Sequence, residues 1–252
     1  MMNSQNFIEI DSVSKMYGLG TQQVTALQDV SLSFGKEEFI CLLGPSGCGK
    51  TTLLNMLAGF ELPTTGILRA FGEPVEHPGA DRTMMFQDYA LFPWLTVEQN
   101  IKYGLKRKGC EKKEQQRISE HYVKLIDLVG FEQKYPRQLS GGMRQRVALA
   151  RALAVQPKML LMDEPFAALD SFTRERMQDE LIRVWQAERK AVVFVTHSIN
   201  EALKLADKIV VMSSRPGRVS GVIEMDDDRP RDLDSPANIA SAKRIRDILH
   251  LT

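Results

Sequence analysis

An eight-residue glycine-rich segment carries the clearest chemical signal. It reads Gly44-Pro45-Ser46-Gly47-Cys48-Gly49-Lys50-Thr51 and matches GxxxxGK[ST] at every position. Its glycines let the backbone wrap round a polyphosphate, and a helix starting at Lys50 adds unpaired N–H donors. We expect Lys50 to reach the β- and γ-phosphates, Thr51 to ligate Mg²⁺, and Thr52 to border the nucleotide. A glycine-rich turn without a ligand is the plainer alternative, but the complete match favours nucleotide binding.

Two adjacent carboxylates follow a short apolar run later in the chain. Met159–Met162 has the composition of a buried strand, and Asp163 and Glu164 come directly after it. Ligands of open parallel sheets bind at the carboxyl ends of strands, so Asp163 is expected to hold Mg²⁺ opposite Thr51. Glu164 is then placed to accept a proton from an attacking water, which favours hydrolysis. Taken alone, the pair is also typical of a solvated loop.

A second helix start carries two glycines behind a serine. Ser140, Gly141 and Gly142 follow Leu139 and open a helix expected to run toward Ala154. A serine cap without bulky neighbours makes this helix N-terminus another anion site. A plain capped helix is the alternative for these residues taken alone.

These motifs need a framework of short strands and helices. Apolar runs predict strands over Phe7–Val13, Val30–Phe34, Phe39–Leu43, Ile67–Phe71, Thr83–Phe86, Met159–Met162, Ala191–Val195 and Lys208–Met212. Helices are expected over Lys50–Ala58, from Thr96, and over Glu111–Val129, Ser140–Ala154, Ser171–Glu188, Ser198–Leu205 and Ser235–His250. Apolar strands that alternate with helices predict an α/β fold with a parallel sheet covered on both faces. The strand-rich beginning predicts an antiparallel β subdomain beside that sheet.

The chain is expected to form a single domain of 252 residues. Residues 1–87 and 156–222 would form the nucleotide-binding core with the β subdomain. Residues 88–155 would form an inserted α-helical subdomain, and residues 223–252 a tail that ends in an amphipathic helix. The helix expected over Glu111–Val129 carries an apolar face that includes its last residue.

The composition is that of an ordinary globular protein. Basic and acidic side chains number 33 and 32, and 43% of residues are hydrophobic. Such balance provides no large field for holding nucleic acid. No apolar run approaches the roughly 18 residues that span a bilayer, and the first residues do not resemble a secretory signal. Cys41, Cys48 and Cys110 lack metal-site spacing and are expected to be reduced thiols, as in a cytosolic protein.

The three motifs together resemble a known family. LSGGMRQR at 139–146 lies between GPSGCGKT at 44–51 and LLMDEP at 160–165, an order similar to that of the ATP-binding cassette (ABC) ATPases. The resemblance covers essentially residues 7–222. It implies a P-loop NTPase fold with a RecA-like core, and ATP and Mg²⁺ as the ligands.

The resemblance implies roles for further residues. Gln87 resembles the Q-loop glutamine that meets Mg²⁺ and the attacking water, and Asp170 belongs to a segment that resembles the D-loop. His197 resembles the switch histidine at the γ-phosphate, and Tyr17 the aromatic residue that stacks on adenine. The plainer alternatives are a surface amide, a helix cap and core packing for Gln87, His197 and Tyr17 respectively. The family commonly has serine where this chain has Ala167. Because this hydroxyl is absent, the resemblance does not define the cross-subunit contacts of the D-loop.

A head-to-tail homodimer is also implied. In this family Ser140 and Gly142 bind the γ-phosphate held by residues 44–51 of the partner, so two ATP molecules are buried between two copies. Closure follows ATP binding, and the loss of charge after hydrolysis reopens the pair. The isolated protein is expected to be mostly monomeric, and to dimerise with ATP when Glu164 cannot act.

Two segments indicate a particular branch of this family. FPWLTV at 92–97 and RPGR at 215–218 resemble the nitrate, sulfonate and taurine importers. Phe92 and Trp94 would anchor a permease helix, with core packing as the alternative. The sequence carries one cassette and no membrane helices, which favours a cassette that is a separate subunit of an importer. The regulatory β-domain of sugar-importer relatives is expected to be absent.

The sequence therefore predicts the ATP-hydrolysing subunit of a bacterial ABC importer, peripheral on the cytoplasmic face of the inner membrane. Its expected partners are a second copy, integral-membrane permease subunits and, indirectly, a solute-binding protein, but no nucleic acid. The rival is a soluble ABC-type ATPase acting on nucleic acid or ribosomes. Balanced charge argues only weakly against this rival, because a local basic patch is compatible with a neutral average.

Overall fold

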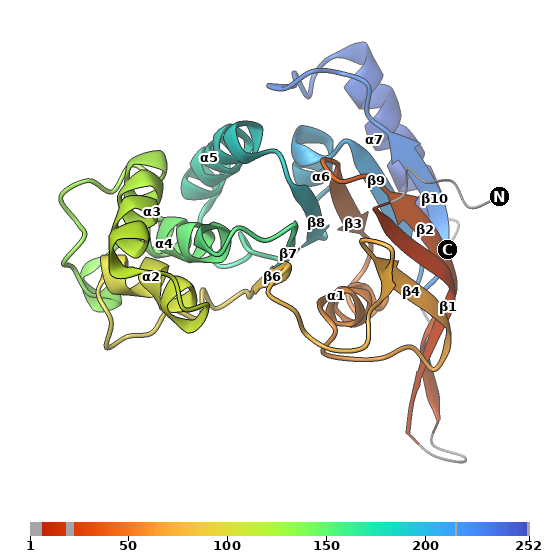
Figure 1. Ribbon diagram of the computed structural model, residues 1–252. Coiled ribbons are helices and arrows are strands. Elements are labelled where there is room, and N and C mark those ends of the chain that lie inside the picture. The colour runs from red at the N-terminus through yellow and green to blue at the C-terminus, as the bar shows by residue number, and fades with distance from the viewer. Residues whose placement is uncertain (1–6, 19–22, 215, 251–252) are drawn as a thin grey trace.

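A computed structural model describes residues 7–18, 23–214 and 216–250 and contains two β-sheets (Figure 1). The smaller sheet is antiparallel with the order β2-β1-β4-β5, formed by β1 Ile8–Tyr17, β2 Val24–Phe34, β4 Thr65–Ala70 and β5 Glu73–Pro74. It confirms the expected antiparallel part. β1 and β2 are longer than expected because their polar ends pair with each other across register shifts, down to Tyr17 opposite Val24.

The larger sheet carries the predicted parallel core. Its order is β10-β9-β3-β8-β7-β6, with β3 Phe39–Leu43, β6 Arg82–Met85, β7 Met159–Asp163, β8 Ala191–Thr196, β9 Lys208–Met212 and β10 Val219–Glu224. All neighbours are parallel except β10, which pairs antiparallel with β9 at the edge. The sequence does not predict β10, which also crosses the expected start of the tail at residue 223.

Alternate residues of β3 face two different cores. Ile40 and Leu42 pack with α1 (Lys50–Ala58) and the antiparallel sheet, whereas Cys41 and Leu43 belong to the core that includes the helices on the other face. These helices include α5 Ser171–Glu188 and α6 Ile199–Leu205. A central strand that is buried on both sides explains why β3 is apolar at every position.

The helical insertion lies between β6 and β7, to the left in Figure 1. It consists of α2 Val97–Arg107, α3 Lys112–Leu125, the short 3₁₀ helix η2 Pro136–Gln138 and α4 Gly141–Ala154. Thr96 begins α2 with a capping box: its hydroxyl accepts from the backbone N–H of Gln99, whose side chain accepts from the backbone N–H of Thr96.

The expectation of a helix over Glu111–Val129 is wrong at its end. α3 stops at Leu125, and Asp127 adopts a left-handed φ of 59°. The turn buries Ile126 and Leu128, whereas Val129 is 65% exposed instead of lying on the apolar face. Burying these two apolar side chains in a turn is the competing gain that ends the helix early.

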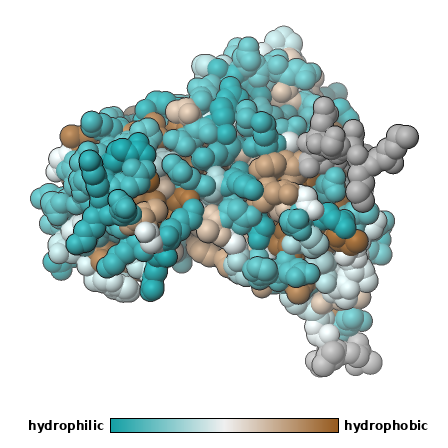
Figure 2. All heavy atoms as spheres, in the orientation of Figure 1, coloured by the Kyte–Doolittle hydropathy of each residue, from teal (hydrophilic) through white to brown (hydrophobic). Residues whose placement is uncertain are grey.

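The tail ends in α7 Pro236–His250, as expected, and packs against α6, β9 and β10. Among the described residues, no helix combines the length and the apolar character needed to cross a membrane. Figure 2 shows mainly hydrophilic side chains on the visible face, with small hydrophobic patches between them.

Candidate nucleotide site

The glycine-rich loop follows β3 and leads directly into α1, as the sequence predicts. Gly49 has a left-handed φ of 86°, which favours glycine. In addition, a Cβ there would lie 2.5 Å from a methyl carbon of Leu27. Gly44 is equally confined, since its Cβ would lie 2.6 Å from the carbonyl oxygen of Met212. The loop is therefore held between β2 and β9, while residues 45–47 remain exposed.

Lys50 is buried inside the curve of this loop. Its side-chain ammonium donates hydrogen bonds to the carbonyl oxygens of Gly44 at 2.8 Å and Pro45 at 3.0 Å, and the residue is only 5% exposed. A buried ammonium requires such partners. The charge therefore lies against the backbone of the loop, where it is suited to pair with phosphate oxygens.

Thr51 and Asp163 meet across the start of α1 and the end of β7. The Thr51 hydroxyl donates to Oδ1 of Asp163 over 3.2 Å, and partial burial raises the pKa of the Asp163 carboxyl. A hydroxyl beside a desolvated carboxylate is a donor set that Mg²⁺ accepts. The described residues contain no group of three or more His, Cys, Asp or Glu side chains that could hold a metal ion, so any Mg²⁺ here would need phosphate or water oxygens as well.

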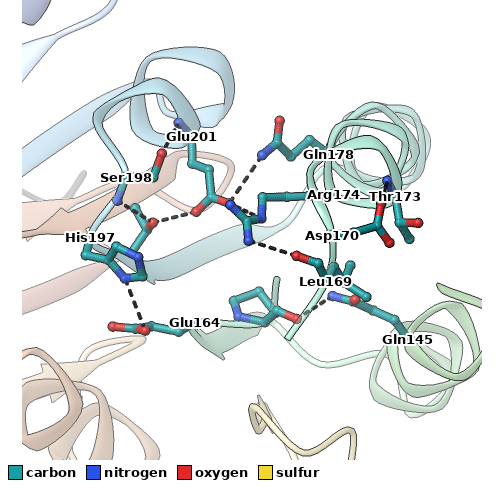
Figure 3. Close-up of polar contacts among 12 residues, drawn as sticks. Gln145, Glu164, Leu169, Asp170, Thr173, Arg174, Gln178, His197, Ser198 and Glu201 are labelled. Carbon is teal, nitrogen blue, oxygen red and sulfur yellow. Dashed lines mark hydrogen bonds and ion pairs between the residues drawn. The ribbon is translucent and has the colours of Figure 1, made fainter. Parts of the chain in front are cut away.

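Glu164 and His197 lie beside this pair at the ends of adjacent strands. The Glu164 Oε2 atom is 3.3 Å from Nδ1 of His197, and the histidine side chain is 62% exposed (Figure 3). Glu164 has a left-handed φ of 43°, an unusual conformation for a residue with a side chain, and its N–H donates to the carbonyl oxygen of Val195. Such backbone strain is common where a side chain must be aimed at a ligand.

Tyr17 lies at the far end of β1 and is 40% exposed, so it is not a core residue. Its hydroxyl donates to the carboxylate of Glu61, which also pairs with Lys15 at 3.5 Å. Burial is the largest of the effects that raise the pKa of Tyr17, and a hydrogen bond with Thr52 at the start of α1 opposes them. Tyr17 is thus oriented by polar contacts next to the helix that carries Lys50.

The serine–glycine turn forms a separate hollow. Ser140 caps α4 by accepting a hydrogen bond from the N–H of Met143. The hollow at this helix start has a volume of about 200 Å³. Its lining consists of Asp127, Ser140, Gly142, Met143, Arg146, Thr173, Arg176, Met177 and Glu180. None of these residues belongs to the 44–51 loop, so within one chain the hollow at the serine–glycine turn is separate from that loop.

Two other predicted site residues are not joined to the phosphate loop. Asp170 caps α5 by accepting from the N–H of Thr173 at 2.9 Å. Gln87, two residues beyond β6, is exposed, and no hydrogen bond links it to Thr51 or Asp163 in the described part of the chain. Among the described residues, direct contacts therefore join Thr51 to Asp163 and Glu164 to His197, whereas Gln87 and Asp170 make no hydrogen bond to any of these four.

The close approach of Gly217, in RPGR, to the 44–51 loop was not predicted from the sequence. Gly217 exchanges backbone hydrogen bonds with β2, donating to Ala26 and accepting from Gln28. A Cβ on Gly217 would lie 2.1 Å from the carbonyl oxygen of Cys48. Arg215 lies outside the described residues. The glycine inside a basic tetrapeptide was the only signal that could have indicated this close approach.

A glycine loop between a parallel strand and a helix, with a carboxylate at a nearby strand end, defines a P-loop nucleotide-binding protein. Residues 27–167, more than half of the chain, match the family described as ABC transporter. The chain therefore belongs to the ABC transporter family.

Named relatives are similar over most of their length. The nitrate import ATP-binding protein NrtD of Synechocystis sp. is 45% identical, over 92% of this chain and 86% of its own. The taurine import ATP-binding protein TauB of Burkholderia pseudomallei is 49% identical, over 82% and 80%. A dimeric post-hydrolysis structure of the ATP-binding cassette MJ0796 with ADP and Pi aligns with a TM-score of 0.74 at 32% identity, covering 88% of this chain and all of that one.

Proposed function

We propose that this chain is the ATP-hydrolysing subunit of an ABC importer for a small solute such as nitrate, a sulfonate or taurine. The observation that carries the proposal is the cluster of Lys50, Thr51, Asp163, Glu164 and His197 at one end of the parallel sheet. The similarity to importer subunits named for nitrate and taurine supports the choice of solute class.

In the proposed reaction, the 44–51 loop and Lys50 bind the phosphates of ATP. Tyr17 stacks on adenine, with Thr52 beside it. Glu164 accepts a proton from the water that attacks the γ-phosphorus, while the bond from this phosphorus to the β–γ bridging oxygen breaks, so that ADP and inorganic phosphate are the products. His197, next to Glu164, contacts the γ-phosphate. Mg²⁺, held through Thr51 and Asp163 with Gln87 nearby, would neutralise charge that develops on the phosphate oxygens.

The second anion site acquires a role only in a dimer. The turn of Ser140, Gly141 and Gly142 opens a hollow without any residue of the 44–51 loop. We infer that two copies pair head-to-tail, so that each turn meets the γ-phosphate on the other copy's loop. The dimeric state of the MJ0796 cassette supports this arrangement. Asp170, at the start of α5, would lie along the same seam.

The helical insertion offers a docking surface for a permease. We assign residues 88–155 to a helical subdomain and the remainder to the core and tail, as expected from the sequence. Trp94 is 69% exposed and its ring lies 5.7 Å from that of Phe92, so it is not a core residue. We propose that Trp94 and Phe92 contact permease subunits, which would hold the chain at the cytoplasmic face of the inner membrane. A solute-binding protein would act on the permease.

Reconstitution with a candidate permease tests the proposal. Liposomes that contain the permease, this chain and a solute-binding protein should take up nitrate or taurine only with internal ATP and Mg²⁺. Uptake should be lost with Lys50→Ala. Hydrolysis of ATP that is stimulated by nucleic acid or ribosomes, without any effect of permease, would instead support the rival function.

A further inference from the structure

A buried carboxylate lies behind the His197 turn. Glu201, in the first turn of α6, is only 8% exposed. Its Oε2 atom accepts from the hydroxyl of Thr196, the last residue of β8, and its backbone N–H donates to the hydroxyl of Ser198 at 3.3 Å. The hydroxyl of Thr196 also accepts from the N–H of Ser198 at 3.0 Å. Glu201 is therefore bonded through its side chain to Thr196 and through its backbone to Ser198, the residues on either side of His197 (Figure 3).

The other oxygen of Glu201 faces α5. Its Oε1 atom accepts from the side-chain amide of Gln178 at 3.2 Å and lies 3.9 Å from Nε of Arg174. That nitrogen is buried, and it makes no hydrogen bond among the described residues. A shift of about 1 Å would convert this loose ion pair into a hydrogen bond.

Arg174 extends the connection to the turn before α5. Its terminal Nη2 donates to the carbonyl oxygen of Leu169 at 2.8 Å. Leu169 directly precedes Asp170, the residue that caps α5. One continuous set of contacts therefore runs from the residues flanking His197, through Glu201 and Arg174, to the 168–170 turn (Figure 3).

A second ion pair joins α5 to α6 and serves as a control, because it holds the two helices together without contacting either turn. Lys204 of α6 pairs with Asp179 of α5 at 2.7 Å, with the Asp179 side chain 64% exposed. This pair has no bond to the His197 turn or to the 168–170 turn.

We propose that Glu201 is a positioning residue that couples the His197 turn to the 168–170 turn, so that the γ-phosphate contact and the cross-subunit segment are set together. The inference rests on the proposed ATP hydrolysis. The side chain of Glu201 acts through Thr196 and Arg174 and has no direct role at the phosphate.

Steady-state ATP hydrolysis by the full chain tests the coupling. Glu201→Gln keeps the size of the side chain but removes its charge, and it should lower kcat about tenfold while KM for ATP stays within about twofold, because small displacements of catalytic groups slow chemistry. Arg174→Gln should have the same effect. The double variant should lose no more than either single one, since both changes break one connection. The control, Asp179→Asn, should keep kcat within about twofold.

The outcomes separate this inference from the proposed function. A wild-type protein that does not hydrolyse ATP would contradict the proposed function, and the coupling with it. Wild-type hydrolysis with unchanged kcat in Glu201→Gln, an equal loss in Asp179→Asn, or losses that multiply in the double variant would overturn the coupling alone. If Glu201→Gln does not fold, Arg174→Gln decides the matter, because the Arg174 side chain is 36% exposed and tolerates replacement better.

Discussion

The Oε2 atom of Glu164 lies 3.3 Å from Nδ1 of His197, although 32 residues separate them in the chain. They meet because β7 and β8 are parallel neighbours, with Asp163 paired opposite Val195. The carboxyl ends of both strands therefore deliver their next residues to the same place. A carboxylate and an imidazole are thus presented together beside Asp163 and Thr51.

Replacement of Glu164 should separate binding from hydrolysis. Glu164→Gln removes the proton acceptor but leaves Lys50 and the loop intact, so ATP should still bind while kcat falls by about 10²- to 10⁴-fold. Phosphate release under saturating ATP measures the loss. Glu120→Gln, on the exposed surface of α3, is the control. Equal rates for wild type and Glu164→Gln would remove Glu164 from the reaction.

Asp163 should reduce stability in the absence of ligand. Burial raises the pKa of its carboxyl, so at neutral pH the ionised form is less favourable in the folded protein than in the unfolded chain. Asp163→Asn should therefore raise the melting temperature at pH 7.5 without nucleotide, by roughly 2–4 °C for each kcal/mol gained. It should also abolish Mg²⁺-dependent hydrolysis.

The gain in Asp163→Asn should shrink as the pH falls, because the wild-type carboxyl becomes protonated below its raised pKa and no longer carries the cost. Calorimetry of both proteins from pH 7.5 down toward 3.8, the ordinary pKa of an aspartate, would follow this change. A lower melting temperature for Asp163→Asn at pH 7.5 would contradict the assignment.

Gly217 should influence ATP binding although it lies outside the phosphate loop. In Gly217→Ala the new Cβ would lie 2.1 Å from the carbonyl oxygen of Cys48, so the loop must shift. We expect the Kd for ATP to rise about tenfold, equivalent to about 1.4 kcal/mol. Gly35→Ala is the matched control, because its Cβ would meet nothing closer than 3.6 Å. An unchanged Kd in Gly217→Ala would show that the loop does not depend on this contact.

Trp94 should matter for assembly with the permease. Trp94→Ala removes an exposed aromatic side chain, the kind of residue that commonly dominates interface energies, and should weaken co-purification with the permease by at least tenfold. The melting temperature should stay within about 2 °C, since surface substitutions are usually close to neutral. Val129→Ala, at a site 65% exposed, serves as the control. Undiminished assembly of Trp94→Ala would move the docking surface elsewhere.

Local patterns were sufficient for much of the fold and of the site. The strand before Gly44 and the helix from Lys50 follow from apolar runs and capping signals, and the meeting of Thr51 with Asp163 follows from the parallel topology. The end of α3 and strand β10 could not be predicted, because tertiary burial decides them.

The contacts of Gly217 and Glu201 also could not be predicted from the sequence. Gly217 contacts Cys48 across 169 positions of the chain, and Glu201 reads in sequence as an ordinary helix glutamate. Their importance arises from contacts between distant segments, which no local periodicity encodes.

The central claim is that each ATP site is completed by a second copy, and sedimentation velocity of Glu164→Gln tests it most directly. Without nucleotide the variant should sediment as one chain of 28.5 kDa, and with saturating ATP at twice that mass. Adding Ser140→Arg should abolish the ATP-dependent dimer while the monomer still binds ATP. A Glu164→Gln protein that remains monomeric while saturated with ATP would contradict the claim.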